Sequence, residues 1–216
     1  MANTLKRIIY FLSFFILLPV CYGQQSNMQQ KDSLKFKNKV VPDVIWREAY
    51  VALSHYPELR DTPIEFKFKK KIKKSFMQAQ PKLGGLLKNR KNRSYVIYMN
   101  EKFKIEDEVF DVTAVPSEVL IGWLGHELGH IMDYRDRSAL EMVWFGVRYL
   151  TSDNYIREAE RVADTYAVNH GLGQEIIATK NFIINHSRLS DTYKNRIQDL
   201  YLSPEEIMVL INEVPD

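Results

Sequence analysis

Two histidines and a glutamate in the stretch HELGH, residues 126–130, have the types and spacing of a metal-binding group. On a helix of 3.6 residues per turn, residues four apart lie about 40° apart around the axis and about 6 Å along it. Both imidazoles can therefore reach one ion from the same helical face. Glu127 lies about 100° round from His126, so its carboxylate can reach a water beside that ion without becoming a ligand. The spacing predicts a catalytic zinc site that includes His126 and His130, with Glu127 as the general base.

A zinc site that catalyses a reaction usually has three protein ligands and one position open to water. Glu160 and Asp164, which begin thirty residues after His130, are again four apart in a predicted helix. We expect Glu160 to be the third ligand and Asp164 to accept a hydrogen bond from the outer nitrogen of a ligand histidine. Glu158 competes for the ligand position, but it lies about 200° from Glu160 and has no acid four residues after it. We therefore expect His126, His130 and Glu160 to bind Zn²⁺.

These two motifs, HELGH and the later ERVAD at 160–164, resemble those of the gluzincins, zinc peptidases with H-E-x-x-H and a downstream E-x-x-x-D. The form with Ala163 before Asp164 is similar to the group that includes HtpX and the CAAX-prenyl proteases. The resemblance covers only the catalytic core of that group and not its transmembrane helices. The metzincin pattern does not fit, because it would need glycine and histidine where this chain has Asp133 and Asp136.

The resemblance implies the same three zinc ligands, with Glu127 acting first as general base and then as general acid, and with Asp164 behind the ligands. It also implies a cleft with a sheet strand along its edge, where an extended substrate pairs with that strand through backbone hydrogen bonds. We expect the segment SYVIYMN, residues 94–100, to be this strand.

Gluzincins often use a tyrosine, histidine or arginine to support the developing oxyanion, and the sequence offers His186, Tyr193 and Arg196 as candidates after the Glu160 helix. Three glycines, Gly122, Gly125 and Gly129, occur within the predicted metal helix. Glycine costs up to about 1 kcal/mol at each helical position, so we expect another element to approach this helix closely.

The elements that must position these residues follow from the hydrophobic periodicity. A helix is predicted from Pro42 to Tyr56, and alternating apolar residues predict strands at 64–72 and 94–100, with a loop at 81–93 between them. From residue 117 onward the pattern is helical, with predicted helices at 117–134, 138–150, 154–170, 174–187, 190–201 and 204–212. The predicted fold is α+β and zincin-like, with a small, mostly antiparallel N-terminal sheet, an active-site helix and a mostly helical C-terminal half.

The first residues predict export. Lys6 and Arg7 precede the apolar run 8–18, which at eleven residues is too short for a membrane span, and small residues follow it. We expect a signal peptide at 1–23, a flexible polar leader at 24–40 and a metallopeptidase domain at 41–216. Lipid attachment through Cys21, the only cysteine, is a less favoured alternative. After removal of the signal peptide no stable membrane span is expected.

Together these observations predict an exported zinc metallopeptidase that hydrolyses a peptide or protein substrate with a zinc-activated water. Two alternatives stay open. One is a zinc hydrolase that acts on a different amide or ester. The other is a non-catalytic zinc-binding protein that docks on an acidic partner through residues 67–93, which contain eleven Lys or Arg and no acid. This basic segment also fits a solvated strand face and loop, and export argues against a nucleic-acid partner.

Overall fold

A computed structural model describes residues 36–70, 72, 75–85, 90–100, 102–105, 108–185 and 191–213 of the 216-residue chain. The predicted signal peptide, including Cys21, lies outside these residues. A compact unit begins at Lys37. Its first strand, β1 (Lys39–Val40), lies within the segment 24–40 that the sequence assigned to a leader.

A four-stranded sheet forms the N-terminal part of this unit, in the order β1-β2-β4-β3. Its other strands are β2 (Ile64–Lys69), β3 (Met77–Pro81) and β4 (Tyr95–Asn100). Buried residues alternate with more exposed ones in β2, which is the period-two pattern of a strand with one face on the core, whereas β4 is buried at five of its six residues. β1 pairs parallel with β2, β2 pairs parallel with β4, and β3 pairs antiparallel with β4. A separate antiparallel pair comprises β5 (Lys102–Ile105) and β6 (Glu108–Asp111).

The prediction of a mostly antiparallel sheet is wrong, because two of the three pairings in the four-stranded sheet are parallel. The reason is β3, which the sequence analysis did not identify. Its residues, MQAQP, contain no β-branched or aromatic side chain, so their strand propensity is weak. β3 takes the antiparallel place beside β4, and β2 then pairs with the other side of β4 in the parallel direction.

The rest of the described chain is mostly helical, so the fold is α+β as predicted. The helices are α2 (Trp46–Ser54), α3 (Ser117–Asp136), α4 (Ala139–Thr151), α5 (Asp153–Asn169), α6 (Gly173–Asn185), α7 (Asp191–Leu200) and α8 (Pro204–Glu213). The six helices predicted from residue 117 onward are confirmed, with ends displaced by no more than two residues. Within the described ranges, no helix combines the length and apolar character that a bilayer span requires.

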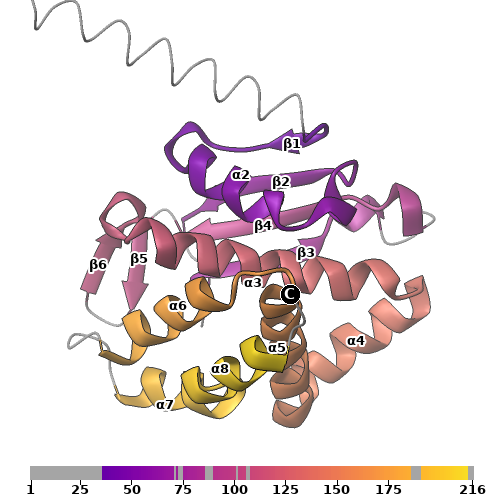
Figure 1. Ribbon diagram of the computed structural model, residues 1–216. Coiled ribbons are helices and arrows are strands. Elements are labelled where there is room, and N and C mark those ends of the chain that lie inside the picture. Colours follow the sequence, from indigo (N-terminus) through magenta and orange to yellow (C-terminus); the bar gives the residue numbers. More distant parts are fainter. Residues whose placement is uncertain are drawn as a thin grey trace, which may run out of the picture. The chain divides into compact units, whose positions relative to one another are not determined.

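Helix α3 passes between the sheet and the C-terminal helices, as Figure 1 shows, and it is buried along most of its length. The predicted close approach at its glycines is confirmed. A Cβ at Gly122 would overlap the backbone of Glu175 in α6, and a Cβ at Gly129 would overlap the backbone of Ala163 in α5. A Cβ at Gly125 would overlap the side chain of Leu172. The glycines thus let α5 and α6 lie against the helix that carries HELGH.

Candidate metal centre

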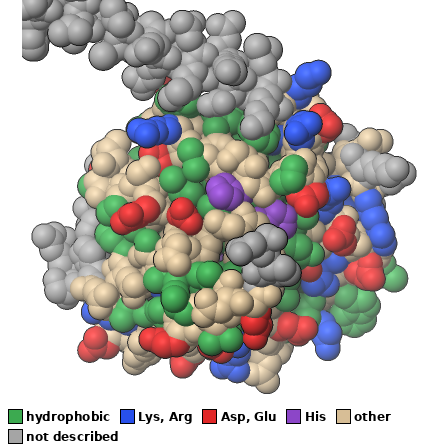
Figure 2. Space-filling view, viewed as in Figure 1, with side chains coloured by type: hydrophobic (Ala, Val, Ile, Leu, Met, Phe, Trp, Pro, Cys, Tyr) green, Lys and Arg blue, Asp and Glu red, His purple; other side chains and the backbone are tan. Residues whose placement is uncertain are grey.

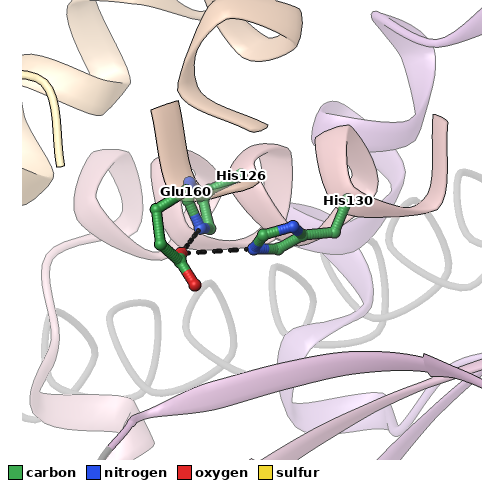
Figure 3. A group of neighbouring side chains, drawn as sticks. All are labelled: His126, His130 and Glu160. Carbon is green, nitrogen blue, oxygen red and sulfur yellow. Dashed lines mark hydrogen bonds and ion pairs between the residues drawn. The ribbon is translucent and has the colours of Figure 1, made fainter. Parts of the chain in front are cut away.

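His126 and His130 of α3 and Glu160 of α5 converge on one point, as Figure 3 shows. The Oε2 atom of Glu160 lies 3.0 Å from Nε2 of His126 and 3.3 Å from Nε2 of His130. Ligand atoms around a tetrahedral zinc, at bond lengths of about 2.0–2.1 Å, lie about 3.3 Å apart. The two distances to Glu160 are thus close to those between ligands of one ion, and all three ligand atoms lie within 4.8 Å of one another.

Of the two neighbouring glutamates, Glu160 is the one that lies with the histidines. Glu160 is 4 % exposed and faces the histidines, whereas Glu158 is exposed to solvent. The side chains of His126 and His130 are also largely buried, at 7 % and 6 % exposed. Figure 2 shows histidine side chains reaching the surface on the face in view.

Asp164 lies behind His126, where the sequence predicted it. Its Oδ1 accepts a hydrogen bond of 2.8 Å from Nδ1 of His126. The same carboxylate is 2.9 Å from the buried ammonium of Lys180 in α6 and accepts a hydrogen bond of 3.2 Å from the backbone N–H of Leu202. Burial opposes ionisation of Asp164, but the charge of Lys180 and the bond with His126 keep its pKa below the ordinary value. Asp164 is therefore a fixed carboxylate that orients the His126 ring.

The hydrogen bonds of His126 favour a positive charge between its Nε2 atom and the carboxylate of Glu160. A carboxylate only accepts hydrogen bonds, so Nδ1 of His126 must carry the proton toward Asp164. The lone pair of a neutral His126 would then point from Nε2 at the carboxylate of Glu160, which is unfavourable without a positive charge between them. Burial disfavours a charged imidazole, but hydrogen bonds with Asp164 and Glu160 outweigh it and raise the pKa of His126 to about 10. Nε2 of His126 therefore binds either a proton or a metal ion.

The charges that line the site fit a divalent ion. Among the described residues these are three buried acids, Glu127, Glu160 and Asp164, and one buried base, Lys180. With all four ionised and both histidines neutral, the site carries two net negative charges, which one divalent cation would neutralise. Burial opposes ionisation of Glu160, yet the charge of His130 and bonds with both imidazoles hold its pKa well below the ordinary range. A buried His-His-Glu group of this kind can bind a metal ion.

Glu127 lies beside the three converging groups and is not one of them. Its side chain is buried, and its Oε2 accepts a hydrogen bond of 2.5 Å from the backbone N–H of Ala79 in β3. Burial raises the pKa of the Glu127 carboxyl above its ordinary value, against the opposing charges of His130 and His126. A carboxylate with a raised pKa takes up a proton more readily, which is the property a general base needs.

The strand at the site differs from the predicted one. The segment 94–100 contains β4, which lies inside the sheet between β2 and β3. The edge strand next to α3 is β3, and the Ala79 N–H that reaches Glu127 comes from it. The alternation of buried Met77 and Ala79 with the more exposed Gln78 and Gln80 is the signal that could have identified it.

Tyr149 of α4 is a further residue at the centre, and the sequence analysis did not identify it. Its hydroxyl donates a hydrogen bond of 2.7 Å to Oε1 of Glu160. Burial and the charge of Glu160 raise the pKa of Tyr149, whereas the positive charge of Arg196 acts in the opposite direction. Of the other two candidates for oxyanion support, His186 and the side chain of Tyr193 lie outside the described part of the chain.

The two remaining described histidines make structural contacts. Nδ1 of His55 is 2.7 Å from the carbonyl oxygen of His170, and the His170 ring stacks on Tyr56.

A small cavity of about 40 Å³ adjoins the centre and has His126 and Glu127 in its wall. Apolar side chains make up most of its other walls, from β3, α3, α6 and α7: Met77, Trp123, Ile176, Ile183 and Ile197. An apolar group could therefore lie next to the Glu127 carboxylate.

Comparisons of the chain with protein-family models, with curated proteins and with solved structures found no match. The geometry of this centre is therefore the basis for inferring a function.

Proposed function

We propose that this protein is a zinc-dependent peptidase of the gluzincin type with a zincin-like fold. The observation that carries the proposal is the convergence of His126, His130 and Glu160, with the carboxylate of Glu127 beside them and outside the group. A site that only holds a metal for structure has no use for a buried, unligated acid at this position. Two helices from distant parts of the sequence supply the group, as the gluzincin motifs imply.

His126, His130 and Glu160 would bind the ion through Nε2, Nε2 and a carboxylate oxygen. A zinc ion there would polarise the scissile carbonyl and lower the pKa of an attacking water. The chain's own groups carry the proton. Glu127 takes it from the water as the oxygen–carbon bond forms, and passes it to the amine nitrogen as the carbon–nitrogen bond breaks. Asp164 holds His126 in the tautomer that leaves Nε2 free to coordinate.

β3 supports a peptide rather than a smaller amide as the substrate. It is the edge strand on the side of Glu127, so an extended peptide could pair with backbone groups of its outer edge other than the Ala79 N–H, which bonds Glu127. The small cavity beside Glu127, at about 40 Å³, would take only a small group of that peptide, such as a methyl. Export by the predicted signal peptide would place the activity outside the cytoplasm.

The metal-binding part of the proposal is tested by measuring the zinc content of the purified chain. We expect about one zinc per chain, loss of the metal in Glu160→Gln, and retention in Glu158→Gln. The second variant is a matched control, because Glu158 is on the same helix but is exposed. Equal metal content in both variants would contradict the assignment of Glu160.

The catalytic part is tested with a mixed library of quenched fluorescent peptides. Glu127→Gln should keep the metal and abolish cleavage, by a factor of about 10² or more. Glu118→Gln, at an exposed position of the same helix, should cleave like the parent. A parent chain that holds zinc but cleaves no peptide would instead support a binding protein, and turnover of small esters or amides alone would support a different zinc hydrolase.

A further inference from the structure

Helix α4 has a second apolar face that the fold leaves in solvent. Its buried face, with Met142 and Phe145, packs toward α5 and carries Tyr149 to Glu160. On the opposite face lies a row of large apolar side chains, here called the apolar stripe. Its members and their exposed fractions are Leu140 70 %, Val143 58 %, Trp144 61 %, Val147 46 % and Leu150 85 %. Half of the exposed large hydrophobic residues of the described chain are on this one helix, so their clustering needs an explanation.

The spacing of the stripe is that of a helix-pairing seam. Leu140, Val143, Val147 and Leu150 follow the alternating three- and four-residue steps of positions a and d in a heptad. The order is also symmetric about Phe145, since a leucine stands at each end and a valine on each side of the centre. In an antiparallel pair related by a twofold axis at this centre, each leucine would meet a leucine and each valine a valine of the other copy.

The charges beside the stripe favour the same arrangement. Glu141 and Arg148 lie on the flank of α4 next to Trp144, seven residues apart and nearly symmetric about the same centre. When two such helices pair antiparallel, equal flanks face each other, so Glu141 of each copy would lie opposite the arginine of the other. A hollow on this flank, lined by Arg137, Trp144, Phe145, Arg148 and Tyr155 among others, leaves space for the indole of the second copy.

We propose that the apolar stripe is a dimer interface, in which α4 packs antiparallel against α4 of a second copy of this chain. The stripe exposes on the order of 600 Å² on each copy, which is the most that its burial in a pair could remove, against the ~800 Å² per partner of a standard interface. A membrane surface is a less suitable partner for the stripe. A helix that lies on a bilayer carries several basic residues on its polar side, whereas the charges of Glu141 and Arg148 on α4 cancel each other. The proposal depends on α4 and is independent of the proposed peptidase activity.

Sedimentation equilibrium of the full chain, from about 1 to 100 µM, tests the interface. The parent is expected to be a dimer, and Val143→Glu to raise the dissociation constant about a hundredfold or more, because the acid appears twice in the interface. Val209→Glu is the matched control, since Val209 is on α8 with 56 % exposure. A monomeric parent, or equal dissociation by both variants, would overturn the proposal.

Exchange of the charges at Glu141 and Arg148 tests whether the two α4 helices pair in the antiparallel direction. Glu141→Arg alone and Arg148→Glu alone should each weaken the dimer, because each puts like charges opposite one another, and the double exchange should restore it. Circular dichroism of each variant checks that the helices are intact. Failure of the double exchange to restore the dimer in folded protein would refute this register. A parent that stays monomeric but floats with vesicles of anionic phospholipid, and loses this with Val143→Glu, would assign the stripe to a membrane and refute the dimer.

Discussion

Gly129→Ala tests whether the close contact of α3 with α5 positions the metal centre. The Cβ of an alanine at 129 would lie closer than 3.0 Å to the carbonyl oxygen of Ala163, a separation that real side chains do not adopt. Since the obstacle is backbone, the two helices must move apart by several tenths of an ångström. Glu160 and Asp164 are on the helix that moves, while His126 and His130 stay on α3.

The expected magnitude follows from this displacement. Metal sites tolerate deviations of about 0.2 Å from ideal ligand distances, so the shift should lower zinc affinity tenfold or more. Overpacking of this kind should also lower the free energy of unfolding by about 1–3 kcal/mol. Gly146→Ala is the matched control. Gly146 is also helical, but a Cβ there would meet nothing within 4 Å, so the fold should gain about 0.5–1 kcal/mol.

Urea denaturation of the chelated protein and competition with a zinc indicator measure these two effects separately. A Gly129→Ala variant that unfolds at the parental urea concentration and binds zinc with the parental affinity would show that this contact does not position the metal centre. The same conclusion would follow if Gly146→Ala weakened zinc binding as much as Gly129→Ala does, because the effect would then come from the loss of any helical glycine.

Three further perturbations address the groups around the centre. The raised pKa of His126, about 10 against an unfolded value near 6.5, means that the metal-free fold gains stability that is fully present below pH 6.5 and is lost as the pH rises toward 10. The urea midpoint of the chelated protein should therefore fall as the pH rises across this range. Zinc binding at pH 8 should also release close to one proton, measurable by calorimetry in buffers of different ionisation enthalpy. A urea midpoint that does not change with pH, together with no proton release, would contradict the claim that Nε2 of His126 holds either a proton or a metal ion. Tyr149→Phe removes one hydrogen bond to Glu160 and should weaken zinc binding about 10-fold while the urea midpoint changes little; unchanged affinity would mean that this hydroxyl does not support the ligand. Lys180→Met leaves the buried Asp164 without its ammonium and should lower the free energy of unfolding by about 3 kcal/mol, whereas Lys194→Met on α7 should have almost no effect; equal urea midpoints for these two variants would rule out the buried ion pair as a stabilising element.

The residues of the centre were predictable because the information for each pair is local. The period of a helix places His126 next to His130, and Glu160 next to Asp164, whatever the rest of the fold does. The excess of glycine in α3 indicated a close neighbour for a similar reason, since a helix gives up stability at each glycine unless another element needs the space. The helical spacing of apolar residues likewise predicted the six C-terminal helices.

Contacts between elements distant in the sequence were decided only by the tertiary structure. β3 has no strong strand propensity, and it is a strand because its backbone pairs with β4, which also places the Ala79 N–H on Glu127. Tyr149 and Lys180 reach Glu160 and Asp164 across helix interfaces, and no spacing in the sequence encodes those distances. A local pattern thus determined which side chains could bind a metal. The tertiary structure determined which groups contact those side chains and shift their pKa values. These groups come from α4, α5, α6 and the edge of the sheet packed around α3, and their contacts exist only when the whole chain is folded.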